Sequence, residues 1–350
     1  MRIAMISTPF VPVPPPQYGG TELIVAELVE GLIAAGHEVT LFTCGEEGPD
    51  VRALYGTPHW PPDPYPELEH ASWALGEVLA DRRGFDVIHA HVPSALAFAP
   101  FVDVPMVYTV HHDRDPRLCS LYARTRAQLI AISARQRELS PELEGAQVIH
   151  HGISPDRYPL GEGAGKYAAF LGRFSSEKGV HHAIDVARAA GVPLRLAGGP
   201  HFRDRDYFAR WVRPRLGAPG VTAIGLVGGV EKSAFLAGAC ALLFPIDWEE
   251  PFGLVMIEAM LCGTPVLAFA RGSVPEVIEE GVTGYLCADE DEMAEHLGAL
   301  ARGGFDRRRC RTRAREQWSA RRMVAEHLAL YHEVAELDAD GRRAHASPIA

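Results

Sequence analysis

The sequence predicts an α/β protein built from two doubly wound, Rossmann-like domains. The chain has 350 residues, which is enough for about two domains of ordinary size. Short apolar runs alternate with segments of helical periodicity, and this order implies parallel strands joined by right-handed crossovers. The alternation stops once, at a stretch rich in Pro, Gly and polar residues (158–166), and then begins again.

The expected elements follow one another along the chain. In the first half, strands are expected at 2–7, 38–43, 86–91, 104–110, 128–133 and 146–152. Helices are expected at 22–35, ending at Gly36, and at 69–83, after a Pro-rich stretch (58–66). In the second half, strands are expected at 167–172, 193–198, 221–225, 240–245, 265–270 and 283–287. Helices are expected at 179–190, at 231–238 and from Pro251, taken as a first helical residue.

These elements divide the chain into an N-terminal domain (1–160) and a C-terminal domain (161–318). A helix at 319–336 is expected to return to the first domain, and 337–350 to form a disordered tail. Nine arginines fall within 302–322, a pattern more typical of a solvated helical face than of contact with an anionic surface.

Composition argues for a soluble protein and against a nucleic-acid binder. The apolar fraction of 47% and the charged fraction of 23% are ordinary for a globular protein, and the net charge of −11 opposes binding to a polyanion. There is no signal peptide and no run of roughly 20 apolar residues, so we expect a cytoplasmic protein that is still free to touch a membrane surface. The six cysteines lack C-x-x-C spacing and the sixteen histidines lack H-E-x-x-H, so we expect reduced thiols and no metal site.

The stretch DWEEPFGLVMIEAM (247–260) places two acids around a turn and a helix start. Glu250 lies beside backbone N–H groups that attract phosphate, and its carboxylate can accept hydrogen bonds from sugar hydroxyls. Glu258 lies inside an apolar run and needs a polar partner if it faces inwards. On local grounds, an exposed Glu258 and a Glu250 that only caps the helix are an equal alternative.

Three further features point to anion and sugar binding. In FLGRFSSEKGV (170–180), Arg173 and Lys178 are spaced to converge on a phosphate, unless they are incidental surface cations. In QYGGTE, Gly20 precedes Thr21, a good helix N-cap, and this loop either approaches a phosphate or acceptor or is a tight turn. His111 follows an expected strand, where a neutral imidazole could contact a sugar hydroxyl.

Together, QYGGTE, DVIHAH, YTVHHD, GRFSSEKG and E-P-F-G-L-x-x-x-E resemble the retaining glycosyltransferases of family GT4, which have the GT-B fold of two Rossmann-like domains facing each other across a cleft. The resemblance extends from the N-terminus to about residue 336. It implies metal-independent, front-face transfer from a nucleotide-diphosphate sugar, UDP- or GDP-linked, to a small or lipid-linked acceptor. It implies no cofactor.

The resemblance also assigns roles to individual residues. Arg173 and Lys178 would hold the diphosphate, Glu250 the sugar hydroxyls and Glu258 the ribose. His111 would contact the transferred sugar. The positions implied in donor binding are Gly20, Arg173, Lys178, Glu250, Phe252, Gly253, Leu254 and Glu258. Of the residues with a role, His111, Glu250, Arg173 and Lys178 would act on the reacting groups.

One difference from the family pattern and three alternatives to transferase activity stay open. His150-His151-Gly152 stands where family members commonly carry Pro-Asn-Gly. A GT-B epimerase, a phosphorylase and a non-catalytic sugar-nucleotide-binding protein are the alternatives. Nothing suggests the cofactor lysine of a phosphorylase, and a binder would not need the sugar-facing pair Glu250 and His111. The base, the sugar, the acceptor and the oligomeric state are not indicated by the sequence.

Overall fold

The computed structural model describes residues 1–17, 19–163 and 166–346, with side chains as far as Leu337. The chain forms two compact units. The first contains Met1–Pro15, Gly19–Gly152 and the C-terminal helix from Ala320. The second contains Ile153–Ser319 together with residues 16–17.

The first unit is built on a parallel sheet of seven strands in the order β3-β2-β1-β4-β5-β6-β7. The strands are β1 (Arg2–Ile6), β2 (Glu38–Thr43), β3 (Val51–Ala53), β4 (Val87–Ala90), β5 (Met106–Val110), β6 (Gln128–Ala131) and β7 (Gln147–Val148). Chain order reverses between β1 and β4, which creates a switch point where ligands bind in doubly wound sheets.

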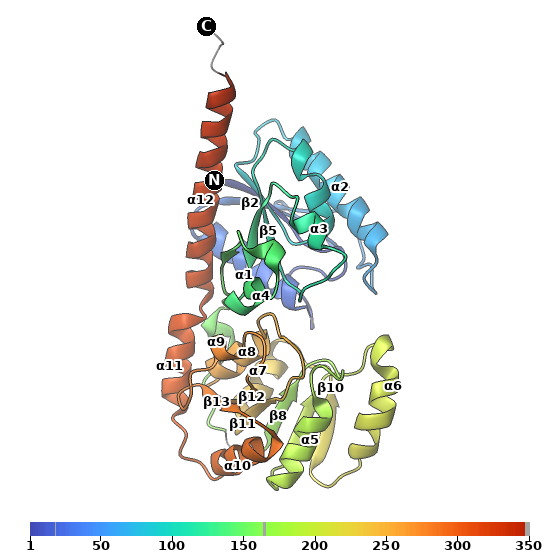
Figure 1. Ribbon diagram of the computed structural model, residues 1–350, viewed down its shortest axis with the longest axis vertical. Helices are drawn as coiled ribbons and strands as arrows, with labels where there is room; N and C mark the ends of the chain where they lie inside the picture. Colours follow the sequence, from blue (N-terminus) through green and yellow to red (C-terminus); the bar gives the residue numbers. More distant parts are fainter. Residues whose placement is uncertain (18, 164–165, 347–350) are drawn as a thin grey trace. The chain divides into compact units, whose positions relative to one another are not determined.

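Helices cover this sheet (Figure 1). They are α1 (Gly20–Ala34), α2 (Pro64–Ala80), α3 (Cys119–Tyr122), α4 (Ala134–Glu138) and α12 (Ala320–Ala346). The long helix α12 packs against α1 and β4. A Cβ atom at Gly31 would lie 2.5 Å from Val324 Cγ2, so a glycine at this position is what lets the two helices approach so closely.

The second unit repeats the design with six parallel strands in the order β10-β9-β8-β11-β12-β13. The strands are β8 (Ala168–Leu171), β9 (Leu194–Ala197), β10 (Val221–Gly225), β11 (Ala241–Phe244), β12 (Val266–Phe269) and β13 (Gly284–Cys287). Its helices are α5 (Val180–Ala189), α6 (Arg205–Tyr207), α7 (Gly229–Gly238), α8 (Leu254–Leu261), α9 (Val274–Val277), α10 (Glu290–Ala301) and α11 (Arg307–Gln317). The switch point here lies between β8 and β11.

The prediction of two doubly wound domains is confirmed, and every predicted strand is present, but the details differ in three places. Strand β3 is too short to show a pattern and was not expected. Helix α2 begins at Pro64, inside the Pro-rich stretch, because Asp63 caps it by accepting the N–H of Tyr65 at 2.8 Å. The expectation of a tail from 337 is wrong as far as Ala346, where α12 ends; 347–350 lie outside the described residues.

The interpretation of the Arg-rich region as a solvated face is wrong for two residues of α11. The guanidinium of Arg307 donates to the carbonyls of Gly161 (2.7 Å), Ala237 (3.0 Å) and Ala239 (3.0 Å). Arg311 donates to the carbonyls of residues 155, 158 and 261. Several of these carbonyls, those of Ala237, Ala239 and Leu261, lie at the C-terminal ends of α7 and α8, where the last carbonyls of a helix need donors from outside it.

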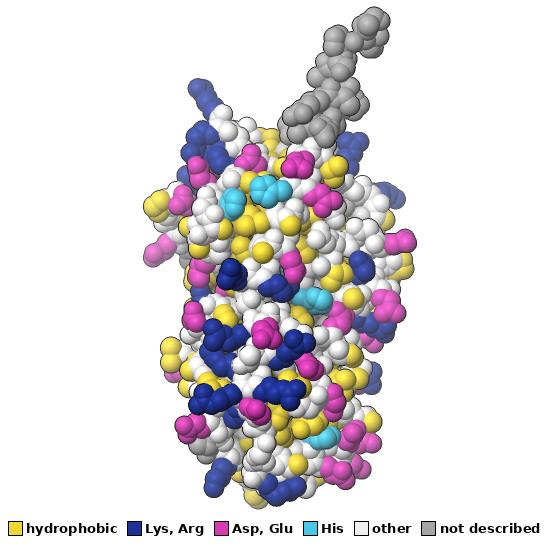
Figure 2. Space-filling view, turned by 90° about the vertical axis from the view of Figure 1, so that its left-hand side faces the viewer, with side chains coloured by type: hydrophobic (Ala, Val, Ile, Leu, Met, Phe, Trp, Pro, Cys, Tyr) yellow, Lys and Arg dark blue, Asp and Glu magenta, His cyan; other side chains and the backbone are white. Residues whose placement is uncertain are grey.

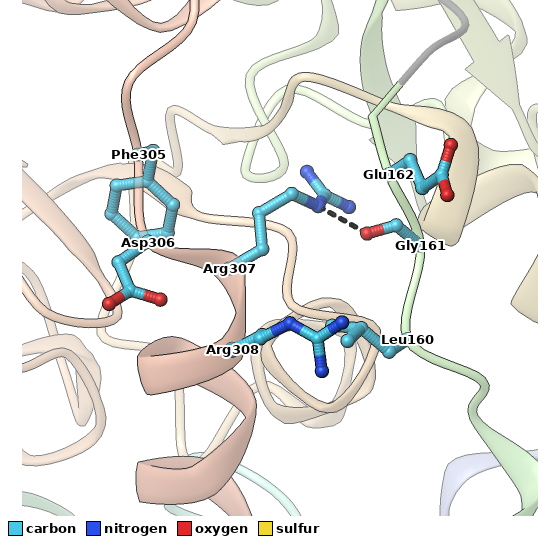
Figure 3. A pocket seen from close by; sticks show the side chains of 7 residues that line it. All are labelled: Leu160, Gly161, Glu162, Phe305, Asp306, Arg307 and Arg308. Atoms are coloured by element: carbon cyan, nitrogen blue, oxygen red, sulfur yellow. Dashed lines mark hydrogen bonds between the residues drawn. The ribbon is translucent and has the colours of Figure 1, made fainter.

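Other arginines of this helix are exposed. Arg308, Arg309 and Arg315 reach the solvent, and Figure 2 shows basic side chains gathered on this side of the molecule at the level of α11. Figure 3 contrasts the neighbours, which line the same pocket: Arg307 is hydrogen-bonded to the carbonyl of Gly161, whereas Arg308 extends toward Leu160. Only part of the basic run is therefore available for surface contacts.

This contrast yields a first prediction. Replacing Arg307 by Ala removes the partner of several part-buried carbonyls, and we expect the free energy of unfolding to fall by about 3 kcal/mol. Arg308→Ala, one residue along the same helix, should change it by less than about 0.5 kcal/mol. Urea denaturation of both variants checks this, and equal midpoints for the two would contradict the structural role of Arg307.

Candidate functional site

In the second unit, the predicted anion-binding residues lie at the carboxyl ends of the two strands that flank the switch point. Arg173 follows β8, and Glu250 lies in the loop that follows β11. Gly179, the residue before α5, has φ +67°, and a Cβ there would lie 1.9 Å from the carbonyl oxygen of Pro245. The glycine of the GRFSSEKG stretch thus lets the start of α5 approach the end of β11, which brings Lys178 to the same edge.

Lys178 and Glu250 form an ion pair at this edge, with Nζ and Oε2 2.5 Å apart. The indole N–H of Trp248 donates to the same oxygen at 3.0 Å, and the Lys178 ammonium lies 4.5 Å from the centre of the Trp248 ring. Glu250 is 8% exposed. The alternative in which Glu250 only caps the helix is wrong, because the N-cap of α8 is Gly253 and no side chain among the described residues caps this helix. Trp248 was not predicted as a site residue, although it lies two positions before Glu250.

Arg173 is held by carboxylates of its own unit. Its guanidinium pairs with Glu177, one turn further along the chain, and Nε lies 3.4 Å from Oδ2 of Asp204. The side chain is still 30% exposed, so an anion can reach it. The loop therefore presents two cations, Arg173 and Lys178, each balanced by an acid.

Glu258 does face inwards, and it has the polar partners that a buried carboxylate requires. It is 4% exposed. The hydroxyl of Tyr158 donates to Oε1 at 2.7 Å, and the ammonium of Lys232, from α7, lies 2.5 Å from the same oxygen. The alternative of an exposed Glu258 is wrong. The sequence contained no signal for Lys232, because its helix pattern alone did not show which way it faces.

The turn before α8 differs from the expectation in its helix start. Helix α8 begins at Leu254, with Gly253 as its N-cap in the left-handed conformation (φ 82°), so Pro251 lies in the preceding turn and is not helical. The Phe252 side chain is 2% exposed and packs edge-to-face on Trp318, with ring centres 5.8 Å apart. The turn thus offers a ligand the backbone N–H groups of Gly253 and Leu254, while the Phe252 ring belongs to the core.

In the first unit, His111 lies at the carboxyl end of β5, as predicted, and belongs to a row of imidazoles. Its Nε2 lies 2.7 Å from Nδ1 of His91, which follows β4. Its ring stacks on that of His151, with centres 5.3 Å apart. Burial, with a smaller effect of a charge on His112, lowers the pKa of His111 to about 3. His111 is thus neutral at pH 7, and the His150-His151 departure contributes one member of the row.

His112 faces a different set of partners. Its Nδ1 donates to the carbonyl of Asp113 at 2.6 Å, and its Nε2 lies 2.7 Å from the hydroxyl of Tyr122. The two adjacent histidines are therefore built into separate networks, and only His111 is connected to the switch point of this sheet.

The glycine loop leads into α1, which begins at Gly20 with Gly19 as its N-cap. Thr21 lies inside the helix, so its prediction as N-cap is wrong. Glu22, in the first turn, is buried and accepts a hydrogen bond of 2.5 Å from the Thr8 hydroxyl, and burial raises the pKa of this carboxyl. A Cβ at Gly19 would lie 2.8 Å from Glu22 Oε2, so the glycine leaves room for this acid, which was not predicted as a site residue.

Residues 1–17, 19–163 and 166–346 contain no group of three or more His, Cys, Asp or Glu side chains arranged to hold a metal ion. Over the same residues, no helix combines the length and apolar character needed to cross a membrane.

Comparison with known proteins now adds to this geometry. Residues 18–157 match the family described as "Glycosyltransferase Family 4", and residues 158–317 match "Glycosyl transferases group 1". The two matches adjoin and together cover both units. The chain belongs to glycosyltransferase family GT4. This glycosyltransferase has the GT-B fold, and the resemblance found in its motifs is confirmed.

Individual relatives agree with the assignment. A glycogen synthase from Mycobacterium tuberculosis is 29% identical over 87% of this chain and 86% of its own. The solved structure of AviGT4, a glycosyltransferase involved in avilamycin A biosynthesis, superposes with a TM-score of 0.73 at 25% identity and covers 96% of this chain and 98% of its own. HepE from Anabaena, solved with UDP and glucose, shares the fold at a TM-score of 0.73 and 19% identity, over 95% of this chain and all of its own.

The ion pair inside the second unit gives a second prediction. Lys232→Met leaves the Glu258 carboxylate buried without its counter-charge, and we expect a loss of about 3 kcal/mol in the free energy of unfolding. The double variant Lys232→Met/Glu258→Gln removes both charges and should recover at least half of that loss. Chemical denaturation of the four proteins of this cycle checks it. If Lys232→Met is as stable as the parent, the pair is not what stabilises Glu258.

The imidazoles of the first unit give a third prediction, on pH. Burial lowers the pKa of several histidines, among them His89, His91, His151 and His327, the last to about 4. Each stays neutral in the folded chain but is protonated in the unfolded chain below its ordinary pKa of about 6.5, so stability should fall as the pH drops below that value. Glu22 has the opposite effect on stability. Because burial raises its pKa, this carboxyl binds a proton more readily in the folded chain than in the unfolded chain, and its contribution to stability increases as the pH falls toward the acidic range.

The measurement is the free energy of unfolding at a series of pH values between about 7 and 5. His327→Gln should reduce the slope by up to about 1.4 kcal/mol per pH unit, because one proton fewer is taken up on unfolding. His59→Gln removes an exposed histidine and serves as the matched control. A parent protein whose stability is flat over this range would contradict the neutral state of these imidazoles.

Proposed function

We propose that this glycosyltransferase moves a sugar from a nucleoside-diphosphate sugar, UDP- or GDP-linked, to an acceptor hydroxyl, with retention of anomeric configuration and without a metal ion. The observation that carries the proposal is the pair Arg173 and Lys178 at the switch point of the second sheet, next to the start of α8. A diphosphate needs such a combination of a planar guanidinium, a compact ammonium and backbone N–H groups.

The donor diphosphate would replace the acids as the partner of these cations. Without a donor, Arg173 is paired with Glu177, and Lys178 with Glu250. When the glycosidic bond breaks, negative charge grows on the departing diphosphate. Cations and N–H dipoles that are already oriented stabilise that charge more in the transition state than in the ground state. This is how the site would accelerate transfer without a metal.

The two acids would bind the hydroxyl groups of the donor. Glu250 lies beside Lys178, so its carboxylate would accept hydrogen bonds from the sugar attached to the diphosphate. The partners described for Glu258, Tyr158 and Lys232, both lie on Oε1. Oε2 is the oxygen that we assign to the ribose hydroxyls.

In the first unit, His111 would contact the transferred sugar and Gly20 the phosphates or the acceptor. The neutral state of His111 suits a hydrogen bond to a hydroxyl rather than an ion pair with phosphate. In the front-face reaction that we propose, the bond between the anomeric carbon and the diphosphate oxygen breaks as the acceptor oxygen binds the same face. The acceptor proton passes to the departing phosphate oxygen, so no side chain has to act as a general base.

Release of nucleoside diphosphate from UDP- and GDP-sugars, with and without acceptor, tests the proposal. HepE is solved with UDP and glucose, which favours starting with UDP-glucose, although this relative shares only the fold. Acceptor-dependent release of UDP or GDP and an α-linked product from an α-linked donor support the proposal. Tight donor binding without turnover would indicate a binding protein. Interconversion of two free nucleotide sugars would indicate an epimerase. Turnover that depends on free phosphate would indicate a phosphorylase.

A fourth prediction concerns the cations. Arg173→Ala and Lys178→Ala should each lower kcat by about 10²- to 10³-fold, as expected for loss of one group that stabilises an oxyanion-like leaving group. Arg188→Ala changes an exposed arginine on α5 and should leave kcat within about twofold of the parent value. Steady-state assays with saturating donor make the comparison. Parent-like rates in either of the first two variants would rule out the assignment of the diphosphate site.

A fifth prediction separates the adjacent histidines. His111→Ala should lower kcat/KM by about 10-fold or more, because it removes a contact to the transferred sugar. His112→Ala should cost less, since His112 is bonded to Asp113 and Tyr122 instead. The two variants are compared at equal concentrations of folded protein. A larger loss in His112→Ala would move the sugar contact to that residue.

A further inference from the structure

A short chain of three side chains leads from the core of the first unit to His111. Met5, in β1, is fully buried. Its sulfur lies 3.1 Å from Nε2 of His91, and Nδ1 of His91 lies 2.7 Å from Nε2 of His111. Strands β1, β4 and β5 are neighbours in the sheet, and these three residues lie at or just beyond their carboxyl ends.

The chemistry of the thioether decides where the protons are. A methionine sulfur has no hydrogen to donate and can only accept, so the proton of this contact must be on Nε2 of His91. His91 is buried among other imidazoles, and burial keeps its pKa far below the usual value, so it carries one proton only. Nδ1 of His91 is therefore an acceptor.

The position of the proton on the His111 ring follows from that on His91. Because Nδ1 of His91 accepts, Nε2 of His111 must donate across the 2.7 Å contact. His111 is neutral as well, since burial lowers its pKa to about 3. Its single proton is then on Nε2, and its Nδ1 carries a lone pair.

We propose that Met5 and His91 are positioning residues that lock His111 in the Nε2–H tautomer, so that its Nδ1 acts as a hydrogen-bond acceptor toward a hydroxyl of the bound sugar. The sugar side of this inference rests on the proposed function of His111. The tautomer itself does not, because it follows from contacts within the first unit. A sugar hydroxyl would donate to His111 and keep its own lone pairs available.

Other histidines of the unit show which kinds of partner fix a tautomer. Both contacts of His89 are to hydroxyls, of Thr109 at 2.8 Å and of Tyr331 at 2.6 Å, and a hydroxyl can donate or accept. Those contacts leave the tautomer of His89 open. His112 donates through Nδ1 to a carbonyl and, when neutral, accepts through Nε2, which is the opposite tautomer to that of His111. Only a partner that cannot donate, such as a thioether sulfur or a carbonyl oxygen, fixes the histidine as the donor in the hydrogen bond and so fixes its tautomer.

The test reads the tautomer directly. In ligand-free protein with ¹⁵N-labelled histidine, long-range ¹H–¹⁵N spectra distinguish protonated from bare ring nitrogens. We expect a bare Nδ1 and a protonated Nε2 for His111 in the parent protein near pH 7.5. Met5→Leu keeps the apolar volume but removes the acceptor, and both ring nitrogens of His111 should move toward averaged shifts.

Kinetics then connect the tautomer with transfer. Met5→Leu should lower kcat by about two- to tenfold with little change in donor KM, since part of the molecules then present an N–H in place of a lone pair. A thermal unfolding midpoint of Met5→Leu close to that of the parent protein excludes a general packing defect as the cause.

Each result has a definite meaning. A protonated or averaged Nδ1 in the parent protein overturns the proposal, and this measurement stands even if Met5→Leu does not fold. An unchanged spectrum in Met5→Leu overturns the role of Met5. Altered shifts with unchanged kcat overturn the link to transfer. Failure of the proposed function would be seen separately, as absence of donor turnover in a parent protein whose His111 spectrum is as expected.

Discussion

A buried carboxylate must have a counter-charge and hydrogen-bond donors, and this requirement organises the functional edge of the second unit. Glu258 lies in the apolar helix α8 and obtains its partners from two other segments, Tyr158 from the start of the unit and Lys232 from α7. The ion pair joins α7 to α8, two helices that also pack against each other. Since α8 also carries Gly253 and Leu254 at its start, the position of the N–H groups proposed to meet the diphosphate depends on the same ion pair.

The first unit meets a similar requirement by another route. Several of its buried groups at the switch point are imidazoles, which avoid a buried charge by staying neutral instead of gaining a partner ion. A neutral imidazole has one donor and one acceptor nitrogen, so the donor and acceptor in each hydrogen bond along the row are undefined until one partner can only accept. The sulfur of Met5 is such a partner. The two units thus use paired charges at one set of strand ends and neutral, oriented dipoles at the other.

Much of the fold, and the strand ends at which several site residues lie, could be predicted from the sequence, because both depend on local hydrophobic pattern and on the order of elements along the chain. Buried parallel strands are short apolar runs, and the residues directly after them lie at one edge of the sheet, so Arg173, Glu250 and His111 could be placed there in advance. Features with weak local signals were missed: β3 has three residues, and α2 starts among prolines that normally suggest a loop. The Arg-rich helix was misread because a cation that binds backbone carbonyls has the same sequence pattern as one that faces water.

The sequence by itself determined the number of domains, the order of strands and helices, and the family to which the chain belongs, because these follow from hydrophobic periodicity and from motifs contiguous in the chain. Only the tertiary structure decided the partners of the site residues. Lys232 and Glu258 are 26 positions apart and Met5 and His91 are 86 apart. Contacts over such separations depend on which strands become neighbours and which way each side chain points, and periodicity carries neither. The position of Glu258 within an apolar run showed that it needs a polar partner if it is buried, and only the fold showed that its partners are Tyr158 and Lys232.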